Sequence, residues 1–233
     1  MKPSIVILTG AGISAESGIK TFRDHNGLWE NHRVEDVASP EGFGRDPLLV
    51  QKFYNDRRAQ LLSPEVQPNA AHLALAALER KWDGEFLLVT QNVDDLHDRA
   101  GSKKLLHMHG ELLKARCLAT GRVYEWRGAI ALETTCPCCE RIGTLRPHIV
   151  WFGEMPLEME RIYSALSECG LFVAIGTSGQ VYPAAGFVQE VPRAARTVEI
   201  NAERSMMSHA FGEQILGKAG VEVPRFVSAL LAQ

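Results

Sequence analysis

The sequence has no long apolar run, no signal-peptide pattern and no excess of positive charge. No stretch approaches the ~18–20 consecutive apolar residues that a membrane-spanning helix needs. The short apolar run Ile5–Leu8 leads directly into Gly-Ala-Gly without a cleavage pattern, so we interpret it as a core strand. These absences argue against a membrane protein and favour a cytoplasmic location.

Disulfides and nucleic-acid binding are also disfavoured. Five cysteines in 233 residues do not suggest a disulfide framework, and three of them lie within four positions, which is more typical of metal ligands. The formal net charge of −3 argues against a general nucleic-acid binder. A 45% apolar content can bury a substantial core, in one full-sized domain or a large domain with a small insert. The oligomeric state is left open.

Short β-branched runs alternate with helical patterns along most of the chain. Strands buried on both faces are expected at Ile5–Leu8, Phe86–Thr90, Leu171–Ile175 and Thr197–Ile200. Helices are expected at Ala70–Arg80 and Leu157–Glu168. This alternation predicts an α/β fold, a Rossmann-like doubly wound parallel sheet.

Two stretches depart from the alternation and predict a small inserted domain. Residues 31–68 carry a helical segment, Leu48–Leu62, framed by prolines, and residues 114–146 carry most of the cysteines. We expect them to pack together as a helical and zinc-ribbon-like insert. The Rossmann-like domain would then comprise residues 1–30, 69–113 and 147–233.

A glycine-rich loop follows the first expected strand. Gly10 and Gly12 would let the backbone approach a pyrophosphate, and Ser14 and Ser17 add hydroxyl donors. The next glycine arrives only at Gly18, so the spacing is not G-x-G-x-x-G, and a tight turn without a ligand remains the alternative.

Polar residues follow the other expected strands. Gln91, Asn92 and Asp94 come directly after one strand, where a doubly wound sheet holds its ligand. Helix capping by Asn92 or Asp94 is the alternative. Gly176–Ser178 and Asn201–Glu203 follow two later strands and suit phosphate and ribose contacts. Together these strand ends indicate one extended nucleotide site.

Two histidines compete for the role of a general base. His109 is followed by a glycine, which leaves room for a substrate, and imidazole with an ordinary pKa of about 6.5 can accept a proton at neutral pH. His107 is the competitor. A metal site made by both histidines is the weaker alternative, because the nearby cysteines suit a metal better.

The cysteine cluster predicts a structural zinc with an incomplete ligand set. Cys136 and Cys139 form a C-x-x-C pair, and Cys117 lies upstream at a zinc-ribbon-like separation. Position 120, where a second upstream cysteine is expected, holds Thr120. Cys138 is a possible fourth ligand although it adjoins Cys139, and a three-cysteine site or no site stays open. We expect Cys169 to be a core residue.

Five segments in this order resemble the sirtuin family over nearly the whole chain. They are Gly10–Trp29, Thr90–Asp94, His107–Gly110, Arg146–Glu154 and Gly176–Ser178. The chain is most similar to compact bacterial sirtuins of the desuccinylase-capable class. The resemblance implies an NAD-dependent protein-lysine deacylase, a deacetylase and desuccinylase or demalonylase, with acyl-lysine proteins or peptides as substrates.

The resemblance also implies roles for individual residues. His109 matches the general base, and Asn92 and Asp94 match residues that position the nicotinamide ribose and carboxamide. Phe22 would cover the reactive centre and Arg23 would reach phosphate. The implied cofactor-binding set is Gly10, Ala11, Gly12, Ser14, Ala15, Glu16, Ser17, Gly18, Thr21, Phe22, Arg23, Trp29, Gln91, Asn92, Val93, Asp94, Gly176, Thr177, Ser178, Asn201, Ala202, Glu203 and Ala219.

The acyl-lysine substrate has its own implied contacts. The segment comprising Val150, Trp151, Phe152, Gly153 and Glu154 matches the one against which a substrate peptide adds as a strand. Tyr54 and Arg57 resemble a Tyr-x-x-Arg signature for acidic acyl groups. Because positions i and i+3 face the same way on a helix, a phenol and a guanidinium could hold one carboxylate there.

The implied reaction consumes NAD. The acyl-lysine carbonyl oxygen attacks the nicotinamide ribose and nicotinamide leaves. His109 then deprotonates a ribose hydroxyl that attacks the resulting imidate carbon, and water finishes the step, giving free lysine and O-acyl-ADP-ribose. A dehydrogenase, a protein ADP-ribosyltransferase and a non-enzymatic zinc-ribbon adaptor are the rival hypotheses.

Overall fold

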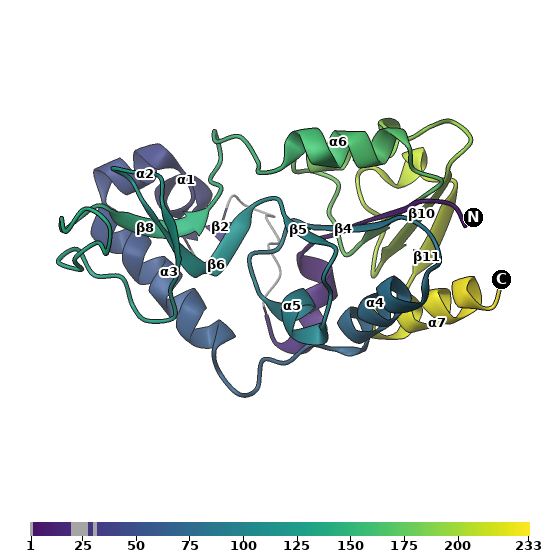
Figure 1. Ribbon diagram of the computed structural model, residues 1–233, viewed down its shortest axis with the longest axis horizontal. Helices are drawn as coiled ribbons and strands as arrows, with labels where there is room; N and C mark the ends of the chain where they lie inside the picture. Colours follow the sequence, from purple (N-terminus) through teal and green to yellow (C-terminus); the bar gives the residue numbers. More distant parts are fainter. Residues whose placement is uncertain (1, 20–27, 30–31) are drawn as a thin grey trace.

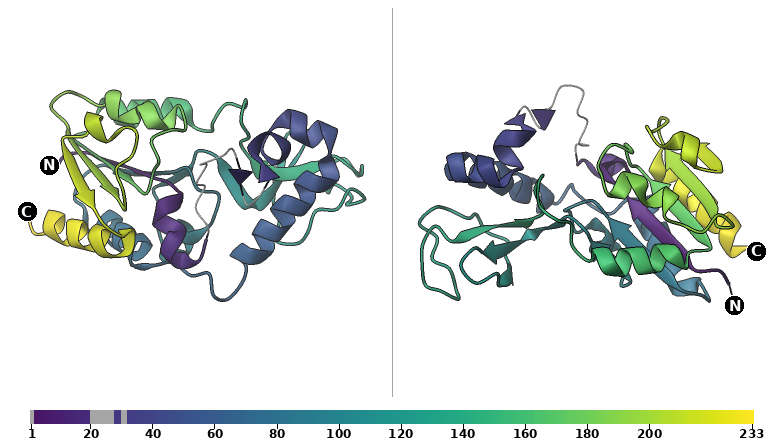
Figure 2. Two further views of the ribbon diagram at one scale, coloured as in Figure 1. Left: turned by 180° about the vertical axis from the view of Figure 1, so that it is seen from behind. Right: turned by 90° about the horizontal axis from the view of Figure 1, so that it is seen from above.

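The computed structural model describes residues 2–19, 28–29 and 32–233. These residues form two lobes side by side (Figure 1). The larger lobe holds both ends of the described chain and a parallel sheet, and the smaller lobe holds α1–α3 and an antiparallel sheet. The chain passes between them several times, as the two further views also show (Figure 2).

Within the described residues, the parallel sheet has six strands in the order β11-β10-β9-β1-β4-β5. The strands are β1 (Ile5–Thr9), β4 (Phe86–Thr90), β5 (Leu105–His107), β9 (Leu171–Ile175), β10 (Arg196–Asn201) and β11 (Glu213–Leu216). Each neighbouring pair is parallel. Read in chain order this is the 3-2-1-4-5-6 arrangement of the Rossmann fold, with its switch point between β1 and β9.

Alternate residues of β1 point to opposite faces of the sheet and build two cores. Ile5 and Ile7 face the helices α4 (Ala70–Lys81) and α7 (Ala219–Leu231). Val6 and Leu8 face α6 (Met159–Ser167) and the 3-10 helix η2 (Ala184–Gln189). Because both faces are covered, the strand is apolar throughout its first four residues, as expected for a central parallel strand.

The smaller lobe packs short helices on an antiparallel sheet. The helices are α1 (Val34–Val37), α2 (Pro40–Arg45) and α3 (Pro47–Leu61). The sheet has the order β7-β6-β8, formed by β6 (Gly110–Cys117), β7 (Val123–Glu125) and β8 (Leu145–Ile149). The short strands β2 (Leu28–Trp29) and β3 (His32–Arg33) pair with each other, and β3 leads directly into α1.

Proline and capping side chains explain where two of these helices begin. Ser39 accepts a hydrogen bond from the N–H of Gly42, and Asp46 accepts one from the N–H of Leu49. In each helix the residue after the cap is a proline, whose fixed φ suits the first helical position and whose missing N–H is not needed there.

The predicted Rossmann-like doubly wound sheet is confirmed, and the four predicted strands agree to within one residue at each end. The expected helix at Leu157–Glu168 begins only at Met159. Leu157 lies outside it because Glu158 has a left-handed backbone conformation, with φ +59°, which cannot continue a helix. No helix of the described segments is long and apolar enough to cross a membrane.

The sequence did not predict several elements, among them β5, β11, α5 (Leu96–Ala100) and α7. β11 is an edge strand with mostly exposed side chains, so it lacks the apolar pattern of a central strand. A proline, Pro224, interrupts the helical pattern of α7.

Candidate active site

The carboxyl ends of β1, β4, β9 and β10 open into a cavity of about 790 Å³. Residues of both lobes line it, including Gly10 from the larger lobe and Tyr54 from the smaller. Its place outside the carboxyl ends of the strands, at the switch point of the sheet, is where doubly wound folds bind their ligands.

Glycines allow two loops to touch on the floor of this cavity. A Cβ atom at Gly12 would lie 2.7 Å from the Cα of Gly176, and one at Gly10 would lie 2.8 Å from the Gly176 carbonyl oxygen. Gly176 has φ +64°, a conformation that L side chains rarely adopt. The loop after β1 continues as the 3-10 helix η1 (Ala11–Ser17) rather than an α-helix.

A buried hydrogen-bond network joins the loop after β1 to the loop after β4. The Asn92 side-chain amide donates to the carbonyl of Gly10 and to the hydroxyl of Ser14, both at 3.2 Å. Ser14 in turn donates to the carboxylate of Asp94 at 3.0 Å. Burial is the largest influence on Asp94 and raises the pKa of its carboxyl group. Two strand ends are thereby fixed in one geometry.

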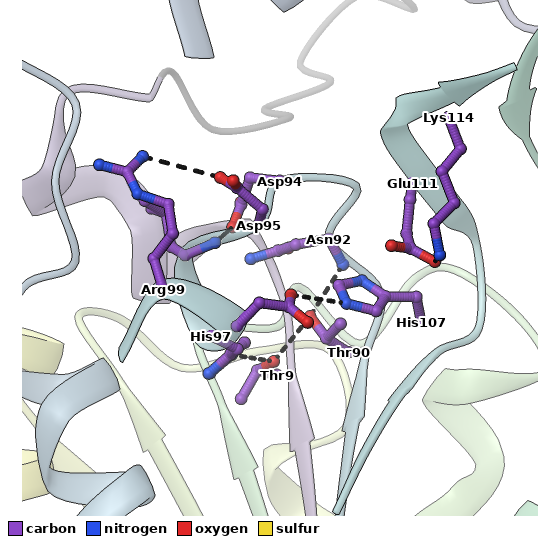
Figure 3. A network of polar contacts seen from close by, with 12 residues as sticks. Thr9, Thr90, Asn92, Asp94, Asp95, His97, Arg99, His107, Glu111 and Lys114 are labelled. Atoms are coloured by element: carbon purple, nitrogen blue, oxygen red, sulfur yellow. Dashed lines mark hydrogen bonds and ion pairs between the residues drawn. The ribbon is translucent and has the colours of Figure 1, made fainter. Parts of the chain in front are cut away.

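Figure 3 shows Thr9 and Thr90, the last residues of β1 and β4, below Asn92. The backbone N–H of Asn92 donates to the hydroxyl of Thr90 at 3.1 Å, and Thr9 donates to that same hydroxyl at 2.9 Å. Thr9 also lies 3.0 Å from the ring Nε2 of His97, which is almost fully buried. Burial lowers the pKa of His97 well below its ordinary value, so this support is uncharged.

His109 lines the cavity, and its ring is oriented by the backbone. Its Nδ1 atom lies 3.0 Å from the carbonyl oxygen of Gln91. Because a carbonyl only accepts, Nδ1 carries the proton and Nε2 has a lone pair. Burial lowers the pKa of His109, against a smaller opposing effect of the Gln91 hydrogen bond. This histidine is therefore neutral at neutral pH.

His107, the competing histidine, is not part of the cavity lining. Its Nε2 atom lies 3.0 Å from a carboxylate oxygen of Asp98. Burial alone would lower the pKa of His107, but the hydrogen bond and the charge of Asp98 raise it. His107 is thus an ion-pairing residue in this structure.

The segment Val150–Glu154 forms one wall of the cavity. Two backbone hydrogen bonds hold it: the N–H of Val150, its first residue, donates to the carbonyl of His109, and that of Phe152, its middle residue, donates to the carbonyl of Ala38. This wall therefore runs between the histidine and the helices of the smaller lobe.

Tyr54 and Arg57 lie on α3, and only Tyr54 belongs to the cavity lining. The Arg57 guanidinium lies 4.6 Å over the ring of Phe53. Its Nε and Nη1 atoms are buried and have no hydrogen-bond partner among the described residues. A buried cation without an acceptor is costly, and an anionic ligand group would supply the missing partner.

Within the described residues, the thiols of Cys117, Cys136, Cys138 and Cys139 lie within 4.8 Å of one another. The sulfur atoms of Cys117 and Cys139 are 3.8 Å apart, and those of Cys136 and Cys138 are 3.4 Å apart. A tetrahedral zinc with Zn–S bonds of about 2.3 Å has sulfur–sulfur edges of about 3.8 Å. The cluster fits a structural zinc.

Most of the predicted site residues come together in the cavity. Those that line it are Gly10, Ala11, Gly12, Ser14, Ala15, Glu16, Tyr54, Gln91, Asn92, Val93, Asp94, His109, Val150, Trp151, Phe152, Gly153, Glu154, Gly176, Thr177, Ser178, Asn201, Ala202, Glu203 and Ala219. Ser17, Gly18 and Arg57 do not line it. Thr21, Phe22, Arg23 and the side chain of Trp29 lie outside the described residues.

The cavity also has lining residues that sequence reasoning missed. They are Ile19, Ala38, Ile149, Pro156, Gln180, Val181, Tyr182, Ile200, Arg204, Ser205, Met206, Gly217 and Lys218. Gly217 and Lys218 join β11 to α7, two elements without a clear sequence pattern. Arg204 follows the predicted Asn201–Glu203 directly, so extending that loop by one residue would have found it.

The fold and the cavity define a Rossmann-like protein with a nucleotide-type site at its switch point. Residues 10–183 match the model of the Sir2 family. The chain belongs to the Sir2 family, the sirtuins.

Relatives of known activity are similar over almost the whole chain. It is 61% identical to an NAD-dependent protein deacylase of Escherichia coli (strain K12) over 231 residues, 99% of this chain and 83% of that relative. It is also 61% identical to an NAD-dependent protein deacylase of Pasteurella multocida (strain Pm70) over 228 residues, 97% of each.

Solved Sir2 structures share the fold. A mutant Sir2 homologue in complex with ADP-ribose superposes with a TM-score of 0.88 at 39% identity, covering 98% of this chain and 93% of that one. A Sir2 homologue in complex with NAD gives 0.87 at 39% identity, covering 98% and 90%. A Sir2 protein bound to a myristoylated histone peptide gives 0.75 at 33% identity, covering 97% and 89%.

Proposed function

We propose that this chain is an NAD-dependent protein-lysine deacylase, which consumes NAD, acyl-lysine and water and releases nicotinamide, free lysine and O-acyl-ADP-ribose. The observation that carries the proposal is one cavity in which a glycine-lined floor, His109 and the segment Val150–Glu154 meet. Relatives that are NAD-dependent protein deacylases at 61% identity support it.

The floor of the cavity suits NAD. The glycine loops at Gly10–Gly12 and Gly176–Ser178 give the diphosphate close access to the backbone, and Asn201–Glu203 offers polar groups to the adenosine ribose. Asn92 and Asp94 are assigned to the nicotinamide ribose and carboxamide, as the resemblance to sirtuins implies. The Ser14 network holds both side chains in place at the cavity. NAD supplies a ribose carbon from which nicotinamide can leave.

His109 is assigned as the general base. Its Nε2 lone pair faces away from the Gln91 carbonyl and can accept a proton from a ribose hydroxyl. The lowered pKa keeps that lone pair available at neutral pH. Removing the proton turns the hydroxyl into a nucleophile toward the acyl carbon, while the ring returns the proton to solvent or to the leaving group later.

The acyl-lysine enters along the segment Val150–Glu154, which we assign to the substrate peptide as a strand-adding edge. Tyr54 then faces the acyl group, and Arg57 supplies a positive charge beyond it. Two buried guanidinium nitrogens of Arg57 have no partner among the described residues, which supports the recognition of acidic acyl groups, succinyl and malonyl, in addition to acetyl.

We further propose a structural zinc held by Cys117, Cys136, Cys138 and Cys139. Cys138 takes the place left by Thr120, whose hydroxyl lies 3.0 Å from the Cys138 sulfur. The zinc would stabilise the turns around β6 and β8 and take no part in the chemistry. Because thiolate ligands must stay reduced, the site also supports a cytoplasmic location.

Mass spectrometry of one peptide with acetyl-, malonyl- or succinyl-lysine, incubated with and without NAD, tests the function. We expect NAD-dependent loss of each acyl group with equal amounts of free nicotinamide. Nicotinamide release without deacylation, or reduction of NAD, would contradict the proposal and favour an ADP-ribosyltransferase or a dehydrogenase.

A further inference from the structure

Trp151 links the wall of the cavity to the residue that faces the acyl group. Its indole Nε1–H donates to the hydroxyl oxygen of Tyr54 at 2.9 Å, and both side chains are almost fully buried. The two residues come from different elements, because Tyr54 lies on α3 and Trp151 follows β8. This bond joins the wall Val150–Glu154 to the helix that carries Arg57.

A charged pair holds the indole in place. The guanidinium of Arg146 lies over the Trp151 ring, with its Cζ atom 3.3 Å from the ring centroid. The same guanidinium binds both carboxylate oxygens of Glu154, at 2.8 and 2.9 Å. Glu154 also accepts the backbone N–H of Trp151 at 2.8 Å. Both the backbone and the ring of Trp151 are therefore fixed by one ion pair.

The Trp151 bond also constrains the direction of the Tyr54 hydroxyl. Since indole N–H is only a donor, the Tyr54 oxygen must accept, and its own proton points away from the indole. Burial is the largest influence on Tyr54 and raises its pKa, so the phenol stays protonated. A neutral phenol can donate to a carboxylate, and an acetyl group offers no acceptor at the corresponding position.

We propose that Trp151 is a specificity-determining positioning residue: its indole N–H orients the Tyr54 hydroxyl so that the hydroxyl can donate to the carboxylate of an acidic acyl group. Arg146 and Glu154 hold the indole in place. This inference rests on the proposed recognition of acidic acyl groups. Trp151 need not touch the acyl group, because it acts through Tyr54. Loss of its N–H should therefore change the choice between acyl groups more than the chemistry common to all of them.

The test uses the full chain with succinyl- and acetyl-lysine versions of one peptide. Trp151→Phe keeps an aromatic ring and removes only the N–H. We expect the succinyl-to-acetyl ratio of the kcat/KM values to fall about fivefold to tenfold, mostly through a higher KM for the succinyl peptide. Tyr54→Phe should also lower the succinyl-to-acetyl ratio. The variant that combines Trp151→Phe with Tyr54→Phe should lower this ratio little more than Tyr54→Phe alone.

Trp126→Phe is the matched control. Its indole N–H also donates to an oxygen, the carbonyl of Ala129, but the residue does not line the cavity. We expect no change in the succinyl-to-acetyl ratio. If circular dichroism shows that Trp151→Phe is unfolded, Arg146→Lys replaces it in the test. This variant loosens the indole without altering it, so it should also lower the succinyl-to-acetyl ratio.

The outcomes separate the two levels of the proposal. A wild-type protein that removes acetyl but no succinyl group overturns acidic-acyl recognition and this inference with it. An active wild type whose Trp151→Phe variant keeps its succinyl-to-acetyl ratio, or loses both activities equally, overturns the role of Trp151 alone. A double variant in which the two losses add in full also overturns the coupling to Tyr54.

Discussion

The Nδ1 atom of His109 lies 3.0 Å from the main-chain carbonyl oxygen of Gln91. Gln91 is the first residue after β4, and its own N–H donates to the carbonyl of Thr9 at the end of β1. The parallel sheet thus fixes the carbonyl, and the carbonyl fixes the tautomer of the histidine. The backbone hydrogen bond at Nδ1 therefore leaves a proton-accepting lone pair at Nε2, and a carboxylate is not needed to fix the tautomer.

Replacing His109 with alanine should abolish most of the activity. We expect kcat for deacylation to fall on the order of 100-fold or more, because the variant has no group to accept the hydroxyl proton. The measurement is the rate of lysine release from an acetyl peptide. His209→Ala, at an exposed histidine outside the cavity, should keep the wild-type rate. Full activity of His109→Ala would refute the assignment.

The pH profile distinguishes the two histidines. A base is active when deprotonated, so kcat/KM should fall as the pH drops through its pKa. For His109, whose pKa is lowered by burial, the fall should lie below the ordinary histidine value of about 6.5, with a plateau around neutral pH. His107 has a raised pKa. A fall centred above the ordinary value would point to His107 instead.

Arg57→Met should separate acidic from neutral acyl groups. The variant removes the charge but keeps much of the side chain, so kcat/KM for succinyl-lysine should fall on the order of 10- to 100-fold while acetyl-lysine is nearly unaffected. Lys52→Met, an exposed position on the same helix, is the control and should change neither value. Equal losses for both acyl groups would remove Arg57 from the substrate site.

Cys138→Ser should lose zinc. Wild-type protein is expected to carry one zinc per chain by elemental analysis, and the variant should carry much less and melt several degrees lower, because a structural zinc contributes directly to stability. Adding Thr120→Cys to that variant should restore both the zinc and the melting temperature. If Cys138→Ser keeps a full equivalent of zinc, Cys138 is not a ligand.

Much of the larger lobe could be predicted because its central strands are buried on both faces. Ile5–Leu8 and Phe86–Thr90 are apolar for that reason, and their ends locate Gly10 and Asn92 in the sequence. Strands at the edge of the sheet lack this apolar pattern. β11 has exposed polar side chains, so the cavity residues Gly217 and Lys218 after it were missed.

The sequence does not predict distances between residues that lie on different elements. The spacing of Cys138 and Cys139 makes adjacent ligands look awkward, but the turn that contains Glu140, with φ +57°, brings their thiols together with that of Cys117. The bond between Trp151 and Tyr54 joins residues 97 positions apart, and no local pattern marks it.

The central claim is that one cavity couples NAD cleavage to deacylation. The direct measurement is the ratio of free nicotinamide to deacylated lysine, quantified together in one reaction of the wild-type protein with NAD and an acetyl peptide. We expect one nicotinamide for each lysine from the wild type, and from His109→Ala no sustained release of either product beyond about one nicotinamide per enzyme molecule. Nicotinamide release that continues without lysine release, with the ADP-ribose label found on protein, would contradict it.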